Sequence, residues 1–164
     1  MAKTFKIDLF DSRSIYKAVN SLRDYEEEFL EACNKAIMEL VDVGVDTAQV
    51  RIVMHDAFYT GNLVDSINGI FNANTRVGVI WSDAYYAAFV EYGTGIVGER
   101  APHPGAESDM WTYDVNGHGD EGWWYLNNGW HFTTGMAARP FLYETRLMLE
   151  QQAPDIYERL VGQI

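Results

Sequence analysis

The stretch that decides the fold of this chain covers residues 85–95 and reads YYAAFVEYGTG. Its aromatic and apolar side chains recur at helical spacing, and the glycine at position 93 stops the pattern. Further along, the segment AARPFLY, residues 137–143, begins a second helix with a proline in its first turn, where proline is tolerated best. We expect these two helical segments to organise the chain around an insertion between them.

The chain has 164 residues, 48% of them hydrophobic, which is long enough for one folded domain with a core. We therefore predict a single domain over residues 1–164, in which residues 96–135 form an inserted loop and a tryptophan-rich hairpin. No apolar run approaches the ~20 residues of a membrane span, and the first residues lack a signal-peptide pattern, so we expect a cytoplasmic product without membrane contact. The single cysteine, Cys33, excludes an internal disulfide framework and is interpreted as a small core residue.

The N-terminal third of the chain is patterned for helices. A short helix is expected to end near Val19, and Asn20 or Ser21 is expected to cap a long amphipathic helix whose pattern continues to about Phe58. Gly44, within a β-branched run, is a candidate kink. Gly61 is predicted to end the long helix in the left-handed conformation.

Strand patterns follow in two pairs, at residues 63–72 with 76–82 and at residues 122–126 with 130–133, and each pair predicts a β-hairpin. Asp83 is expected to cap the helix that ends at Gly93, residues 96–120 to lack regular structure, and Pro154 to break the last helix. The expected fold class is α+β: a long N-terminal helix and a C-terminal helix packed on a small antiparallel β-sheet, with an inserted loop and β-hairpin.

The charge of the chain is strongly and unevenly negative. Its formal net charge is −12, and residues 61–135 alone hold nine acidic and two basic side chains. The basic footprint that neutralises phosphates is missing from this pattern, so direct DNA binding is not expected. An acidic run near residue 27 is interpreted as a solvated helix face, with an interaction surface as the alternative.

The residue types that carry catalysis do not form a recognisable motif. No GxSxG, P-loop or GxGxxG pattern occurs, so we expect neither an enzyme nor a cofactor. The histidines show no metal-binding spacing, and we expect no metal; a loose divalent-ion site in the polar loop is the alternative to solvated side chains, with the candidates His103, Asp109, Asp114, His118 and Asp120. His131 is expected to make a hydrogen bond within its aromatic strand.

Tryptophan is concentrated in the second predicted hairpin, at Trp123, Trp124 and Trp130. These side chains either pack on their own domain or contact a neighbouring subunit, because tryptophan is a favoured interface anchor. Stacking on a sugar or on single-stranded nucleic acid is a third option, and the acidic charge of the region argues against the nucleic acid.

Three segments, TGNLVDSI at residues 60–67, YAAFVEYGT at 86–94 and ARPFL at 138–142, resemble in their order the HK97 gp10-like family of tailed-bacteriophage proteins. The residues that carry the resemblance are Gly61, Leu63, Tyr86, Glu91, Tyr92, Gly93, Thr94, Arg139, Pro140 and Phe141. The insertion between the second and third segments is longer than the family pattern.

The resemblance implies a structural virion protein of the head–tail junction, a neck or tail-completion protein made in the host cytoplasm. It implies a homo-oligomeric ring, a hexamer or dodecamer, between the head connector or stopper and the tail terminator or tail tube, through which DNA passes without specific binding. The competing interpretations are a soluble binding module, which would use the tryptophan-rich hairpin to hold carbohydrate or peptide, and a hydrolase with an unrecognised carboxylate site.

Chemistry suggests a role for several of the motif residues. Gly93 is expected to end its helix in a conformation that is costly for other residues. Glu91 and Arg139 are candidates for an ion pair between the two motif halves, with separate solvation as the alternative. Pro140 and Phe141 are expected to begin and anchor the last helix.

Overall fold

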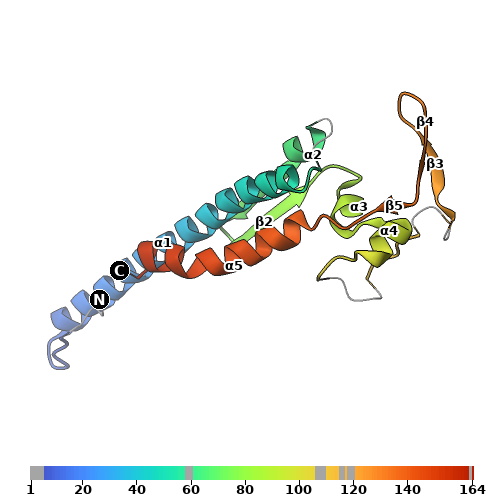
Figure 1. Ribbon diagram of the computed structural model, residues 1–164. Coiled ribbons are helices and arrows are strands. Elements are labelled where there is room, and N and C mark those ends of the chain that lie inside the picture. Colours follow the sequence, from blue (N-terminus) through green and yellow to red (C-terminus); the bar gives the residue numbers. More distant parts are fainter. Residues whose placement is uncertain (1–5, 58–60, 106–109, 115–116, 118–120, 163) are drawn as a thin grey trace. The chain divides into compact units, whose positions relative to one another are not determined.

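The computed structural model describes residues 6–57, 61–105, 110–114, 117, 121–162 and 164. Their elements mix helices with two small two-stranded antiparallel sheets, which confirms the α+β class (Figure 1). The chain forms two compact units, one from residues 1–43, 69–79 and 149–164 and the other from residues 44–68 and 80–148. The single domain therefore stays a prediction. None of the helices in the described residues is long and apolar enough to cross a membrane.

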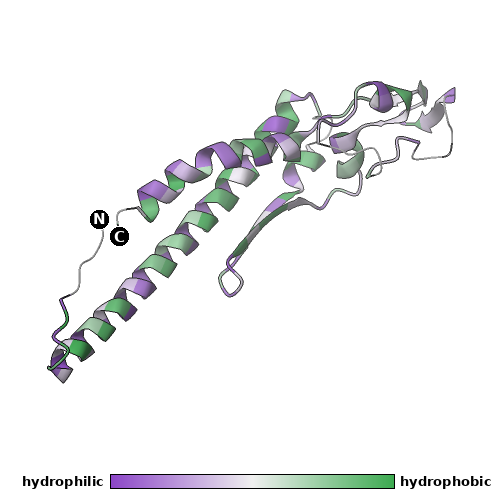
Figure 2. Cartoon of the chain, turned by 90° about the horizontal axis from the view of Figure 1, so that it is seen from below, coloured by the Kyte–Doolittle hydropathy of each residue, from purple (hydrophilic) through white to green (hydrophobic). Residues whose placement is uncertain are grey.

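Helix α1 runs without interruption from Ser12 to Met54, with hydrophobic and hydrophilic residues alternating along it (Figure 2). Asp11 caps it, because its carboxylate accepts the N–H of Arg13 at 3.0 Å. The predicted division near Val19 is wrong. Asparagine and serine cost only a few tenths of a kcal/mol inside a helix, roughly 0.5 each, so residues 20 and 21 do not end it.

The C-terminus of α1 is a Schellman motif centred on an aspartate. Asp56 has φ 51°, its N–H bonds to the Val53 carbonyl at 3.1 Å, and the Ala57 N–H bonds to the Ile52 carbonyl at 3.0 Å. Ala57 and Ile52 also pack in the same apolar cluster, as this motif favours. The helix therefore ends before Gly61, which was predicted to stop it; Gly61, with φ 84°, precedes the short helix α2 (Asn62–Asp65) instead.

One apolar cluster joins α1 to helix α5 (Phe141–Leu160) within the first unit. Its buried members are Ala32, Ala36, Ile156 and Val161, and Cys33 packs against them, as expected of a core cysteine. Pro154 lies inside α5, so the prediction that it breaks the helix is wrong. The proline removes one backbone donor, and burial of the apolar residues after it offsets that loss.

Strands β1 (Ile67–Asn72) and β2 (Val77–Ser82) form the first hairpin, confirmed except that residues 62–65 are helical. A Cβ added to Gly78 would lie 2.5 Å from Val41 Cγ2, so this side of β2 lies directly against α1. Val77 and Val79 alternate with Gly78 and therefore point the other way, where both are exposed.

The core of the second unit gathers residues from five separate segments of the chain. Its buried members come from α1, α2, β1, helix α3 (Ala87–Tyr92) and the start of α5: Ala48, Ile52, Leu63, Ile67, Ala87, Val90 and Phe141. Helix α4 (Gly95–Arg100) follows α3, so residues 96–100 are helical where irregular structure was expected. Asp83 does not cap α3; its carboxylate accepts hydrogen bonds from Asn68 Nδ2 and Trp81 Nε1, each at 2.8 Å.

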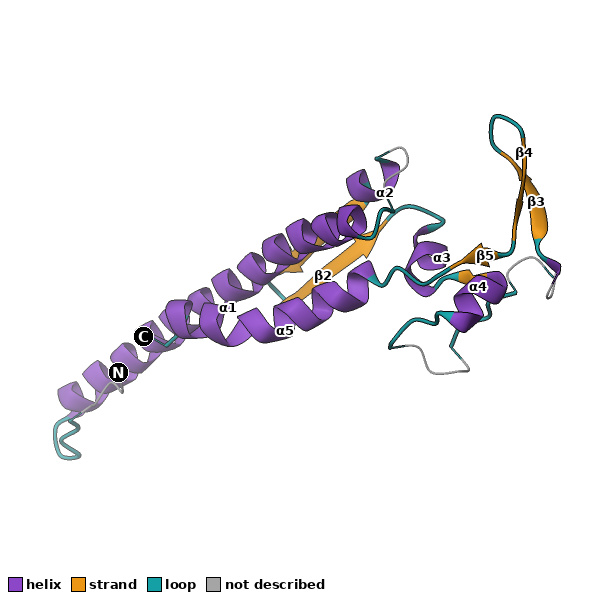
Figure 3. Cartoon of the chain, in the orientation of Figure 1, coloured by secondary structure: helices purple, strands orange, loops and turns teal. Residues whose placement is uncertain are grey.

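The second hairpin is confirmed. Strands β3 (Trp123–Leu126) and β4 (Trp130–Thr133) pair antiparallel around the predicted Asn-Gly turn, and the two-residue strand β5 (Gly135–Met136) follows (Figure 3). In the register, Trp124 faces Phe132 and Leu126 faces Trp130. His131 Nε2 lies 2.9 Å from the Asn127 carbonyl oxygen, the hydrogen bond expected of it.

The Schellman motif gives the first prediction. Asp56→Gly should raise the free energy of unfolding by about 0.5–1 kcal/mol, because glycine adopts the left-handed conformation without a Cβ penalty. The matched control is Glu27→Gly, at an exposed right-handed position inside α1, which should lower it by about 0.5–1 kcal/mol. Urea denaturation followed by circular dichroism measures both, and a destabilised Asp56→Gly variant would contradict the assignment.

Candidate functional site

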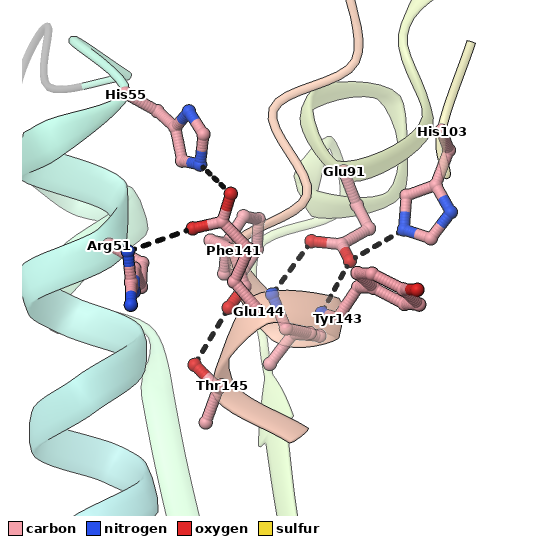
Figure 4. Close-up of polar contacts among 9 residues, drawn as sticks. Arg51, His55, Glu91, His103, Phe141, Tyr143, Glu144 and Thr145 are labelled. Carbon is pink, nitrogen blue, oxygen red and sulfur yellow. Dashed lines mark hydrogen bonds and ion pairs between the residues drawn. The ribbon is translucent and has the colours of Figure 1, made fainter. Parts of the chain in front are cut away.

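The carboxylate of Glu91, on α3, reaches the first turn of α5 (Figure 4). Its Oε2 accepts the N–H of Leu142 and its Oε1 accepts the N–H of Tyr143, both at 2.9 Å. Glu91 is only 4% exposed, so this is a buried charge. It is satisfied by two helical N–H groups that have no partner within the helix and by the positive end of the helix dipole.

The predicted partner of Glu91 was Arg139, and this prediction is wrong. No ion pair joins Glu91 to Arg139 in the part of the chain that the structure describes, since both carboxylate oxygens already accept hydrogen bonds. The two motif halves are joined nevertheless, because the Arg139 backbone N–H donates to the Val90 carbonyl at 2.9 Å. The two motif halves are therefore linked by one hydrogen bond between backbone groups and by the hydrogen bonds of the Glu91 carboxylate to backbone N–H groups.

His103 completes the environment of Glu91 and was missed by the sequence analysis, which placed it among solvated loop residues. It is 5% exposed, and its Nε2 lies 3.1 Å from Glu91 Oε1. Its Nδ1 accepts the N–H of Gly105 at 3.0 Å, so the proton of the neutral ring is on Nε2, pointing at the carboxylate. Both ring nitrogens are engaged, which makes the pair a structural support. Pro102 and Pro104 flank His103 and restrict the backbone there, and they were the sequence signal that this histidine is held in place.

Aromatic rings enclose this pair. Tyr92 lies against His103 with ring centroids 4.5 Å apart and stacks on Trp111 at 5.0 Å, and Tyr143 contacts His103 edge-on at 5.1 Å. Trp111 also donates from Nε1 to the Gly93 carbonyl at 2.9 Å. The rings exclude water from the Glu91 hydrogen bonds, which are stronger in low dielectric.

Besides the Glu91 contacts, a second connection, here called the backbone joint, is made by main-chain atoms between residues 93–95 and residues 135–138. Thr94 bridges Met136 and Gly95 bridges Gly135 in antiparallel pairs. Gly93 has φ 82°, and a Cβ on it would lie 2.7 Å from the Ala138 nitrogen. Gly135 has φ 105°, and a Cβ on it would overlap the Thr94 carbonyl oxygen. Glycine is required here by close approach as well as by conformation.

The other motif residues are structural too. Leu63 and Phe141 are core residues of the second unit, and Tyr86 packs against that core. Thr94 and Pro140 are buried. The structure therefore brings together around α3 and the start of α5 nearly all residues that carry the family resemblance.

A further contact between α1 and α5 was not anticipated from sequence. Glu144 Oε2 lies 3.2 Å from Arg51 Nη1, and Glu144 Oε1 lies 3.2 Å from His55 Nε2 (Figure 4). Glu144 lies about ninety positions after Arg51 and His55 in the chain, so no local pattern could pair it with them. One turn into α5, Thr145 Oγ1 donates back to the Phe141 carbonyl at 2.7 Å.

The tryptophan-rich hairpin differs from the Glu91 site in being exposed. Because paired residues share one side of a hairpin, Trp124, Leu126, Trp130 and Phe132 form a single apolar face, here called the hairpin face. These side chains are between 50% and 69% exposed. Trp123 points to the opposite side and is half-buried.

The structure describes two of the five candidate metal ligands, His103 and Asp114. Asp109, His118 and Asp120 lie outside the described residues, and His103 is engaged with Glu91. Among the residues that are described, no three His, Cys, Asp or Glu side chains are grouped to hold a metal ion.

No protein-family model, curated protein or solved structure matches this chain. The resemblance to the phage family therefore rests on the residues of the chain itself.

Removing the Glu91 carboxylate tests the contact that it makes with the first turn of α5. Glu91→Ala should lower the free energy of unfolding by about 3–5 kcal/mol, because two part-buried N–H groups and the buried His103 lose their acceptor. Glu91→Gln, which keeps one oxygen, should cost less. Glu99→Ala, at an exposed position of α4, is the control and should stay within about 0.5 kcal/mol. Equal effects of Glu91→Ala and Glu99→Ala in urea denaturation would refute the role of Glu91.

The backbone joint makes a separate prediction. Gly135→Ala should destabilise by on the order of 3–5 kcal/mol, because the added Cβ collides with backbone that cannot move aside. Gly117→Ala is the control: its φ of 65° is also left-handed, but no atom of the described residues lies within 4 Å of an added Cβ, so only a conformational cost of about 1–2 kcal/mol is expected. Thermal unfolding of both variants measures the difference, which would vanish if the close approach were unimportant.

Proposed function

We propose that this chain is a structural subunit of a tailed-bacteriophage neck, a tail-completion protein that joins the head connector to the tail. It forms a homo-oligomeric ring, a hexamer or dodecamer, between a head connector or stopper and a tail terminator or tail tube. It is made in the host cytoplasm and is part of the virion. The observation that carries the proposal is the hairpin face, four large apolar side chains held on an exposed hairpin.

A two-stranded hairpin is at best marginally stable in water by itself, and an exposed apolar face adds an unfavourable term. In the described residues the hairpin strands contain no charged side chain, although the chain as a whole carries −12. Interfaces between subunits favour this composition, with tryptophan and phenylalanine at the centre and charges excluded. Burial against another subunit is the simplest use of such a surface.

The Glu91 and glycine joints support the same proposal. A ring closes only if each subunit presents its contacts at a fixed angle. The motif residues lock α3 and the start of α5 through hydrogen bonds and close backbone approach. They act on the geometry of the subunit.

The acidic charge supports the passage of DNA without binding. With twice as many acidic as basic side chains, the surface repels phosphates on average, so DNA gains no adhesive contact with a ring of such subunits. The acidic run at residues 26–28 is exposed on α1.

The second candidate is a binding module in which Trp124 and Trp130 stack on carbohydrate or grip a peptide. The same exposure supports it, since sugar-binding surfaces use open aromatic rings. The two proposals differ in oligomeric state: a module stays monomeric and changes its tryptophan fluorescence with ligand, whereas a neck subunit assembles.

The proposal is tested in the phage particle. Mass spectrometry of purified virions should find this chain at six or twelve copies per particle, and particles lacking it should accumulate as separate full heads and complete tails. Electron microscopy shows the separated heads and tails. A chain absent from purified virions, or joined particles in its absence, would rule the neck function out.

A further inference from the structure

We propose that a cavity beside the first turns of α1 binds a phosphate dianion, either free phosphate or the phosphate group of a small phosphate monoester. The cavity has a volume of about 490 Å³, and the residues that line it all belong to the first compact unit. It is separate from the Glu91 site and from both hairpins. The inference therefore goes beyond the neck function and does not depend on it.

The cavity is formed where the segment before α1 turns back beside the helix (Figure 3). The Asp8 N–H donates to Ser14 Oγ at 2.9 Å, which holds this segment against the second turn of α1. Lys6 lines the cavity from the segment, and Ser14 and Lys17 line it from α1. The α1 residues of the cavity recur at spacings of three and four, so they share one face of the helix.

Three cations, Lys6, Arg13 and Lys17, line this cavity, and none of them makes an ion pair within the described residues. Arg13 and Lys17 lie four positions apart on α1, where like charges repel each other. At the same spacing further along α1, Lys35 is paired with Glu31 at 2.7 Å. A set of unpaired like charges in one place breaks a local rule of helix stability, and such places are expected at functional sites. An anion in the cavity would neutralise the repulsion.

Charge balance selects a dianion. Asp11 is the one carboxylate that lines the cavity, so three cations and one carboxylate leave two positive charges. A phosphate monoester carries about −1.5 to −2 charges near neutral pH and matches this excess, whereas a carboxylate or a phosphodiester carries only one. The N-terminal N–H groups of α1 are not needed for binding, because Asp11 already accepts those of Arg13 and Ile15.

The chemistry and the size of the cavity fit a phosphorylated small molecule. Arginine and lysine form charge-assisted hydrogen bonds to phosphate oxygens, and the arginine fork can bind two oxygens at once. The Ser21 hydroxyl also lines the cavity and has no hydrogen bond within the described residues, so it is free to donate. The buried methyl group of Ala18 closes the inner wall. Small-molecule sites have volumes of about 300–1,000 Å³, so there is room for an organic group beside the phosphate.

The experiment is isothermal titration calorimetry of the full chain near neutral pH and at constant ionic strength. The titrants are inorganic phosphate, ribose 5-phosphate and a short DNA duplex. Arg13→Gln and Lys17→Gln each remove one cation from the cavity. The matched control, Arg23→Gln, removes the same charge from an exposed position of α1 that does not line it. Circular dichroism confirms that the variants are folded.

Wild type and Arg23→Gln should bind inorganic phosphate with the same affinity. Each cavity variant should bind it about tenfold more weakly, as expected for the loss of one charge-assisted hydrogen bond. The two phosphate titrants distinguish the source of the ligand: tighter binding of ribose 5-phosphate supports a phosphorylated small molecule, and equal binding supports free phosphate.

Three results would overturn the inference. The first is a wild-type chain that shows no saturable binding of either phosphate titrant at millimolar concentration. The second is an equal loss of affinity in Arg23→Gln and Lys17→Gln, which would show a general effect of net charge. The third is a DNA duplex that binds more tightly than both phosphates and displaces them, which would identify a nucleic-acid surface. The first two results leave the presence of the chain in virions untouched.

Discussion

The interaction on which the rest of the structure depends is the buried hydrogen bonding of Glu91 to the first turn of α5. A helix leaves its first N–H groups unpaired, and a side chain just before the helix usually satisfies them. Here that position is Pro140, which has no acceptor on its side chain. The carboxylate of Glu91, 51 residues before Leu142 in the chain, takes its place, so the start of α5 is tied to α3.

This arrangement explains why the residues around Glu91 are so constrained. A buried carboxylate is tolerated only when its hydrogen bonds are complete. For Glu91 this requires the Nε2–H of His103 as a donor in addition to the two backbone N–H groups. The segment after α3 must then turn immediately and run beside residues 135–138. Only glycine at positions 93 and 135 permits that approach.

The exposed surfaces of the two hairpins differ in composition from the buried contacts around Glu91. Acidic side chains outnumber basic ones two to one in the sequence, yet both hairpins have uncharged strands with exposed apolar side chains. An exposed apolar surface of this kind is stabilised when it is covered and removed from water. The proposed neck ring would use all three features: the fixed contacts around Glu91 and the glycines, the exposed apolar side chains of the hairpins, and the net negative charge of the rest of the chain.

The sequence by itself determined the features that depend on neighbouring residues. The α+β class, the Asn-Gly hairpin and the stop at Gly93 follow from local periodicity and turn chemistry, because the residues that set them are adjacent in the chain. Tertiary packing decided the rest. Pro154 stays within α5 because apolar residues beyond it are buried. Glu91 prefers helical N–H groups and His103 to Arg139, because burial rewards the partners that complete its hydrogen bonds, and those partners come together only when the chain has folded.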